Sequence, residues 1–134
     1  MIRQAIDYVP ISREHLDGVI RLCEIEQYPS YIRDAKRTWR ALTAPGVCTV
    51  VAVQDDRLVG FAQMQSDGLI QAHLSMIVID RDLRRRGIGG RLVREAFARC
   101  GGQWVDLLST EGADAFYRSF QHQSFPGFRI YPKA

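Results

Sequence analysis

Seven consecutive residues in the second half of the chain combine positive charge with glycine. They read Arg84-Arg85-Arg86-Gly87-Ile88-Gly89-Gly90. An apolar run at 74–79 precedes them and an amphipathic run at 88–100 follows, which predicts a strand, a glycine-bearing turn and a helix start. Glycine lets the backbone approach a ligand closely, and the first N–H groups of a helix lack internal partners at the positive end of its dipole. The stretch therefore predicts an anion site, with phosphate or pyrophosphate as the expected ligand.

The elements that must position this site follow from the spacing of apolar residues. Helical spacing predicts a first helix from an N-cap at Ser12 to a break at Pro29, and further helices over 31–42, 88–100 and 113–120. Runs rich in β-branched residues predict strands at 2–8, 47–53, 58–65, 69–79 and 104–108, with a last strand or tight hairpin within 124–131.

The order of these elements is β-α-α-β-β-β-α-β-α-β. Because the turns between the three central strands are short, those strands should form an antiparallel meander. The order predicts an α/β (α+β) fold in which helices cover both faces of a mixed, mostly antiparallel sheet. With 134 residues and no linker or repeat, we expect a single domain over residues 1–134.

Composition narrows the classes of function. The net charge is only +3, and the arginine excess peaks at 81–94, which favours a small anionic ligand over nucleic acid. No apolar run reaches membrane-spanning length and no signal peptide opens the sequence, so we expect a cytoplasmic protein with no membrane partner. The three cysteines are odd in number, far apart in the sequence and in apolar settings, which predicts reduced core residues. No spacing of cysteines or histidines suggests a metal site.

The motif Arg84-x-x-Gly87-x-Gly89, with Leu92 in the usual apolar place, resembles that of the GNAT superfamily of acyl-CoA-dependent N-acyltransferases. Its position after the meander, and before a strand and a short helix with Phe116-Tyr117, strengthens the resemblance. The resemblance implies an enzyme that transfers an acetyl group from acetyl-CoA to a primary amine, without a metal. It also implies that the CoA pyrophosphate binds the turn at residues 84–90, including Arg85, Arg86, Ile88 and Gly90. The pantetheine arm would lie along the preceding strand, at Ile77, Val78 and Ile79.

The same resemblance suggests catalytic residues. Ala113-Asp114-Ala115-Phe116-Tyr117 matches a family pattern in which the tyrosine often protonates the leaving thiolate. His73 is our candidate base, because some family members place a catalytic carboxylate at this position, and histidine titrates near neutral pH. The acceptor pocket would lie between the first two helices and the neighbouring strand, near Glu24, Glu26, Tyr28, Tyr31, Gln63 and Gln65.

The sequence also departs from the family pattern. Thr110 stands where an asparagine usually precedes the late helix, and Gln121-His122 replaces the usual Gly-Phe pair. The tail is short for the two final strands of the family. These differences concern the wall of the acceptor site and any homodimer contact made by the tail.

Two further functions fit parts of the sequence. Gly87-x-Gly89, with Asp106 about 20 residues further on, partly fits a dinucleotide-binding fingerprint, but Leu92 occupies the third glycine place. A GNAT-fold module that binds acyl-CoA or a partner without turnover is the other alternative, because binding and catalysis use different residues. Nucleic-acid binding is disfavoured because aromatic residues are not interleaved with the arginines.

Overall fold

The computed structural model describes residues 5–133. Its centre is a sheet of five strands in the order β1-β2-β3-β4-β5, comprising β1 (Asp7–Pro10), β2 (Val47–Gln54), β3 (Arg57–Ser66), β4 (Gln71–Ile79) and β5 (Trp104–Asp106). The first four strands are antiparallel neighbours and β5 runs parallel to β4. The predicted meander is therefore confirmed, and it contradicts a dinucleotide-binding unit, which needs parallel crossovers.

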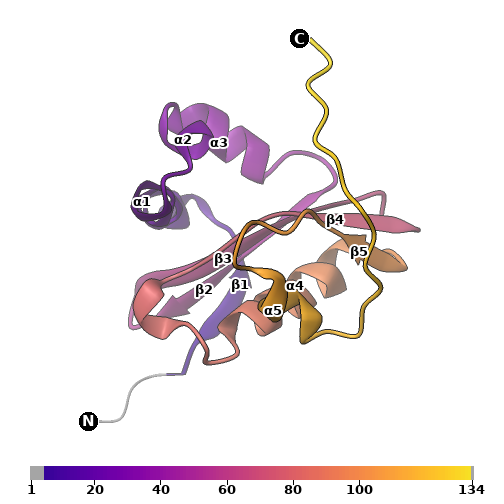
Figure 1. The fold of residues 1–134 in the computed structure, drawn as a ribbon. Helices are drawn as coiled ribbons and strands as arrows, with labels where there is room; N and C mark the ends of the chain where they lie inside the picture. The colour runs from indigo at the N-terminus through magenta and orange to yellow at the C-terminus, as the bar shows by residue number, and fades with distance from the viewer. Residues whose placement is uncertain (1–4, 134) are drawn as a thin grey trace.

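Helices cover both faces of the sheet, as predicted (Figure 1). One face carries α1 (Leu16–Glu26), α2 (Pro29–Ile32) and α3 (Ala35–Leu42), and the other carries α4 (Ile88–Cys100) and α5 (Asp114–Arg118). The pleat of β2 shows why both faces are apolar. Val50 and Ala52 pack in the cluster with Leu92 of α4, whereas Val51 packs in the cluster with Leu22 of α1. None of the helices in residues 5–133 is long and apolar enough to cross a membrane.

The first helical region differs from the prediction. The stripe expected as one helix over 31–42 is two helices, because Asp34 caps a new one by accepting a hydrogen bond from the Arg37 N–H at 3.2 Å. Pro29 opens α2 at its first turn, and α1 ends earlier, at the left-handed Gln27.

The strand ends also shift. β1 reaches Pro10, which has no backbone N–H and is tolerated at the end of an edge strand, where no donor is required. Residues 2–4 of the predicted strand lie outside the described part. β4 begins only at Gln71, because the Asp67 carboxylate accepts hydrogen bonds from the N–H groups of Leu69 and Ile70 and holds a turn there.

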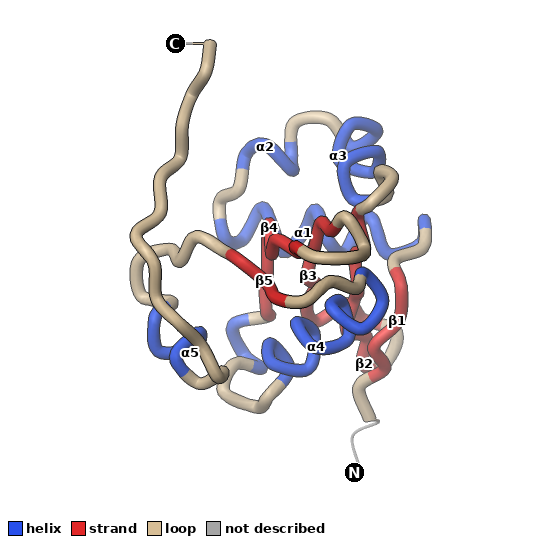
Figure 2. Tube along the Cα trace, turned by 90° about the vertical axis from the view of Figure 1, so that its right-hand side faces the viewer, coloured by secondary structure: helices blue, strands red, loops and turns tan. Residues whose placement is uncertain are grey.

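The prediction of a last strand or hairpin within 124–131 was wrong. The tail leaves α5 in an extended conformation, passes β5 and ends away from the helices and the sheet (Figure 2). Pro126 and Gly127 interrupt the strand pattern, and the three-residue β5 offers a short edge for pairing. The outer edge of β5 has no strand partner among residues 5–133.

Candidate functional site

The site begins where β4 and β5 separate. Their ladder joins only Gln71–His73 to Trp104–Asp106, so beyond His73 no strand within residues 5–133 pairs with β4 on this side. The register between β3 and β4 shifts at the same place, since Gln63 opposes Met76 and Met64 opposes Leu74. Ser75 is therefore the extra residue of a β-bulge, and bulges bend a strand and re-aim its side chains. The part of β4 at residues 74–79, about two thirds of the strand, presents an open edge.

The backbone of this open edge is oriented by the pairing with β3. The Asp80 N–H donates to the Val59 carbonyl at 2.8 Å, so Asp80 faces β3. Orientation alternates along an antiparallel strand, so Val78 also faces β3, whereas the N–H and C=O groups of Ile77 and Ile79 face the open edge. Of the three β4 residues that the resemblance suggested, Ile77 and Ile79 offer free backbone groups and Val78 does not.

The N-terminus of α4 lies just beyond the end of β4. Gly87 is its N-cap with a left-handed φ of 82°, and Arg85 is also left-handed at 65°. The first intrahelical bond runs from the Arg91 N–H to the Gly87 carbonyl at 3.1 Å. No acceptor within residues 5–133 serves the N–H groups of Ile88, Gly89 and Gly90. The predicted arrangement of glycine turn and helix start is therefore present, with three backbone donors free for an anion.

The glycines of this turn have different tasks. A Cβ on Gly87 would meet no atom within 4 Å, so only its positive φ requires glycine. A Cβ on Gly89 would lie 2.9 Å from the Phe116 ring of α5, and one on Gly90 would lie 3.2 Å from the Arg94 guanidinium. Gly89 therefore lets α5 pack closely against α4 and does not point its missing side chain at the anion site.

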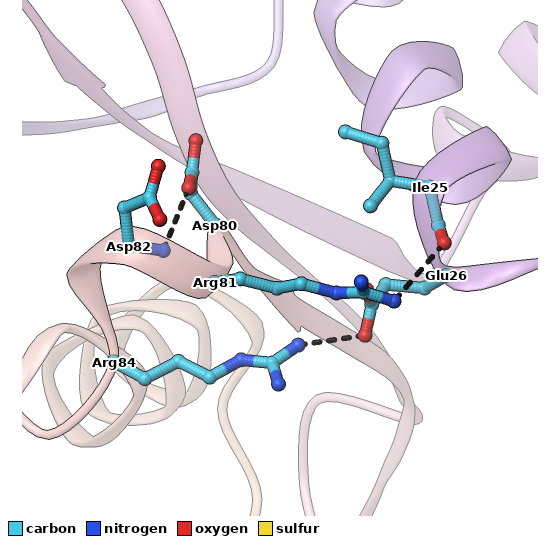
Figure 3. Close-up of polar contacts among 6 residues, drawn as sticks. All are labelled: Ile25, Glu26, Asp80, Arg81, Asp82 and Arg84. Carbon is cyan, nitrogen blue, oxygen red and sulfur yellow. Dashed lines mark hydrogen bonds and ion pairs between the residues drawn. The ribbon is translucent and has the colours of Figure 1, made fainter.

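The arginines around the turn divide into two groups. Arg81 and Arg84 both donate to Glu26, at 2.7 and 2.6 Å, and Arg81 also reaches the Ile25 carbonyl at 3.3 Å (Figure 3). Arg91 pairs with Glu95 at 2.8 Å. Of the arginines around the turn, Arg85, Arg86 and Arg94 have no carboxylate partner among the described residues.

Glu26 was expected near the acceptor, but its carboxylate binds two arginines of the loop that leads into α4. Its side chain is only 18% exposed. Burial alone would raise the pKa of Glu26, but hydrogen bonds from Arg84 and Arg81 outweigh it and leave the pKa below its ordinary value. No sequence motif marked this contact, because its partners are 55 and 58 residues apart. Glu26 thus joins the last turn of α1 to the loop at residues 80–87.

Tyr117 lies at the open side of the sheet. It packs against the core cluster beneath the sheet, and its ring contacts Phe116 edge-on with centroids 5.0 Å apart. Burial raises the pKa of the Tyr117 hydroxyl, and the nearby Tyr28 adds to this shift. Tyr28 belongs to the cluster on the opposite face of the sheet. The hydroxyl of Tyr117 remains protonated at neutral pH.

His73 lies in the paired part of β4, opposite Gln65 of β3 and Asp106 of β5. It is exposed and lines an open cavity of about 370 Å³ together with Gln65 and Asp106. Gln65 donates to the Ser75 hydroxyl at 2.8 Å, so the bulge and His73 share this polar surface. His73 thus lies on β4 where it pairs with β5, whereas Tyr117 lies on α5.

Two of the remaining acceptor-side candidates, Tyr31 and Gln63, form a second polar patch. The Tyr31 hydroxyl donates to the Gln63 side-chain oxygen, and the Gln63 amide donates to the Ala41 carbonyl at 3.3 Å. Gln63 is buried, whereas Glu24 is exposed. Of the predicted acceptor residues, Tyr28, Tyr31 and Gln63 are brought to the sheet, and Glu24 is not.

The cysteines are free thiols that make no contact with the turn before α4 among the described residues. Cys23 is buried in α1, and burial raises its pKa to about 12. Cys100 closes α4 beside Cys48 of β2; burial and a hydrogen bond with that thiol raise its pKa to about 12. Cys48 and Cys100 are therefore in contact although they are far apart in the sequence. A thiol with a raised pKa is a poor nucleophile at neutral pH.

Comparison with known proteins identifies the family. The acetyltransferase (GNAT) domain model matches residues 45–122, which is more than half of the chain. The chain therefore belongs to the GNAT family of acetyltransferases. A mycothiol acetyltransferase from Rhodococcus opacus (strain B4) is 39% identical over 56 residues. That match covers 42% of this chain but only 18% of the relative's length.

Solved structures share the fold over nearly the whole chain. A ribosomal-protein-alanine N-acetyltransferase from Brucella melitensis biovar Abortus 2308 superposes with a TM-score of 0.76 and 16% identity, covering 96% of this chain and 99% of that one. The aminoglycoside N-acetyltransferase AAC(6')-Iy in complex with CoA gives a TM-score of 0.76 at 15% identity, covering 98% and 95%. A Trypanosoma brucei acetyltransferase gives 0.73 at 19% identity, covering 95% and 99%.

The ion pairs of Glu26 generate a prediction about stability. Glu26→Gln should lower the free energy of unfolding by about 1–2 kcal/mol at neutral pH, because charge-assisted hydrogen bonds to two guanidinium groups are lost. Since the folded-state pKa of Glu26 is lowered, its contribution is present above the unfolded-state pKa and disappears as the pH falls through the folded value. Urea titrations at neutral and acidic pH measure both effects.

Glu24→Gln is the matched control, because Glu24 lies in the same helix, is exposed and has no ion pair among the described residues. It should leave stability within about 0.5 kcal/mol of the wild type. Equal effects of the two substitutions at neutral pH would contradict a specific role for Glu26.

Proposed function

We propose that this protein transfers an acetyl group from acetyl-CoA to an amine, within a single catalytic domain formed by residues 1–134. One observation carries the proposal: the free N–H groups of Ile88–Gly90 lie next to the end of a strand that keeps its own edge unpaired. An extended thiol arm that ends in a pyrophosphate matches both features, because the arm can pair with a strand edge and the pyrophosphate with helix N–H groups. The CoA complex of the structural neighbour AAC(6')-Iy supports the donor.

The contacts to the donor follow from the free groups. Ile77 and Ile79 provide backbone hydrogen bonds to the amide groups of the pantetheine arm. The N–H groups of Ile88, Gly89 and Gly90 bind the pyrophosphate, and Arg85, Arg86 and Arg94 provide its counter-charge. We do not assign the side chain of Arg84 to phosphate, because Glu26 holds it.

The proposed reaction is direct attack of the acceptor nitrogen on the thioester carbonyl. The amine must first lose a proton, and the CoA thiolate must leave when the C–S bond breaks. Tyr117 is the proposed acid for the thiolate, since its raised pKa keeps its hydroxyl protonated. His73 is the proposed base, acting through water, because it is exposed on the polar surface beside the bulge.

The acceptor is proposed to approach from the face that carries Tyr28 and Tyr31. Uncharged hydroxyl and amide groups line this face, which suits recognition of a polar amine by hydrogen bonds. The neighbours include enzymes named for aminoglycosides and for the alanine of a ribosomal protein, which supports a small-molecule or peptide amine as acceptor.

The donor site is tested by placing a negative charge on the turn. Gly87→Asp should weaken acetyl-CoA binding at least about 100-fold, since the carboxylate would repel the pyrophosphate, whereas nothing within 4 Å opposes the new Cβ. Gly68→Asp is the control, because Gly68 has nearly the same φ of +81° and similar space in the turn before β4. Calorimetry on both folded variants decides: equal affinities would show that the turn does not hold the donor.

The proposed acid is tested by removing one hydroxyl. Tyr117→Phe keeps the ring packing and should lower kcat by about 10²–10⁴-fold with little change in acetyl-CoA affinity. Tyr8→Phe is the control, because Tyr8 is also half-buried with a raised pKa but lies on β1. Release of free CoA thiol with a panel of amines gives the rates. Donor binding without thiol release for any amine would instead indicate a non-catalytic binding module.

The proposed base is tested by the pH profile. Imidazole accepts a proton only when neutral, so kcat/KM of the wild type should fall on the acidic side. His73→Gln should lower the rate and remove this acidic limb. His122→Gln, which alters an exposed histidine of the tail segment, should keep the limb. An unchanged acidic limb in His73→Gln would assign the proton transfer to another group or to water.

A further inference from the structure

The segment between β4 and α4 is held by few hydrogen bonds of its own backbone. The Asp80 N–H donates to the Val59 carbonyl at 2.8 Å, and the Leu83 N–H donates to the Asp80 carbonyl at 3.0 Å. The next backbone hydrogen bond along the described chain is the first bond of α4. No backbone N–H of residues 84–87 has an acceptor among residues 5–133. Side chains must therefore help to fix this stretch of backbone.

Two residues of the same stretch adopt left-handed backbone conformations. Arg85 has a φ of 65° and Gly87 a φ of 82°. Glycine adopts such a conformation readily, but for arginine it is unfavourable and persists only where the surrounding structure imposes it. The neighbouring Arg84 makes such a contact, because its guanidinium donates to Glu26 at 2.6 Å. The backbone turn that leads to the free N–H groups of Ile88–Gly90 thus lies next to an ion pair.

The Glu26 carboxylate holds two points of the loop to the end of α1 (Figure 3). Its Oε2 accepts from Arg81 Nε at 2.7 Å and its Oε1 accepts from Arg84 Nη2 at 2.6 Å, so each oxygen binds a different guanidinium. A cavity of about 180 Å³, lined by Leu22 of α1 and Asp82 of the loop, lies beside these bonds. Apolar packing therefore does not fill the space between α1 and the loop on this side, and the ion pairs connect the two.

We propose that Glu26 is a positioning residue for the acyl donor. By holding Arg81 and Arg84, it fixes the turn at residues 84–87 so that the N–H groups of Ile88–Gly90 converge on one pyrophosphate position. Glu26 does not touch the donor, and Arg84 acts through Glu26 and not as a phosphate ligand. This inference rests on the proposed function, because it requires the turn to bind acetyl-CoA.

The charge of Glu26 makes the direction of the effect decisive. If Glu26 influenced the donor through charge alone, its neutralisation would release two arginines beside an anion site and strengthen acetyl-CoA binding. If Glu26 positions the turn, its neutralisation lets the turn relax and weakens binding, although the surroundings become more positive. The two roles therefore predict opposite changes in affinity.

Calorimetry with acetyl-CoA and the folded full chain measures this change. Glu26→Gln should weaken binding about 10-fold, which corresponds to the loss of one charge-assisted hydrogen bond. Arg84→Gln should also weaken binding. Adding Glu26→Gln to Arg84→Gln should then cause a much smaller further loss than Glu26→Gln causes in the wild type, because both substitutions break the same contact.

Two control variants separate positioning from general effects of charge and stability. Glu24→Gln removes an exposed carboxylate from the same helix and should leave the affinity for acetyl-CoA unchanged. Asp34→Ala removes the N-cap of α3 and lowers the stability of the folded chain without touching the loop, so it should also leave the affinity unchanged.

The outcomes distinguish this inference from the proposed function. If the wild type binds acetyl-CoA and Glu26→Gln binds it equally or more tightly, this inference is wrong and the proposed function stands. Fully additive losses in the double variant would assign Arg84 to the phosphate directly and would also overturn it, as would equal weakening by Glu24→Gln or Asp34→Ala. A wild type that does not bind acetyl-CoA would contradict the proposed function and this inference with it.

Discussion

The candidate site depends on incomplete strand pairing in the sheet, because β4 is paired to β5 over only three residues. An unpaired strand edge inside a protein leaves polar backbone groups that need partners. Here the bulge at Ser75 and the short β5 keep the strands apart, and α4 begins at the end of the same strand. Strand edge and helix start thus form one continuous row of backbone donors and acceptors. These donors and acceptors are backbone groups, so they do not depend on particular side chains. Such groups suit the binding of a large acyl donor whose structure does not vary.

The charges around this row show how the protein keeps an arginine-rich loop stable. The loop at residues 80–87 carries four arginines, and their mutual repulsion would destabilise the folded chain in the absence of a ligand. Glu26 neutralises two of them from the end of α1. The same contact links the helices of the proposed acceptor side to the proposed donor side. The ion pairs of Glu26 therefore connect the end of α1 to the loop before α4, which lies far from it in the sequence.

The sequence patterns predicted those parts of the fold that depend on interactions between residues close together in the sequence. The bounds of α4 and the three-stranded meander were correct because apolar spacing and turn residues specify them. The division between α2 and α3 at Asp34 was not predicted, because the helical spacing of apolar residues continues past Asp34, the N-cap of α3. The contact of Gly89 with Phe116 was not predictable, because only the tertiary packing of α5 brings Phe116 there. The bond between Glu26 and Arg84 and the fate of the tail are also long-range features. The candidate donor site was thus predictable in outline, and its side-chain contacts were not.

Amide hydrogen exchange with and without acetyl-CoA tests the central claim most directly. If the donor lies along the open edge and on the helix start, binding should slow exchange at Ile77, Ile79 and the N–H groups of Ile88–Gly90. Exchange on β1, the opposite edge of the sheet, should not change. Slowed exchange elsewhere, with unchanged rates at the end of β4 and the start of α4, would contradict the account.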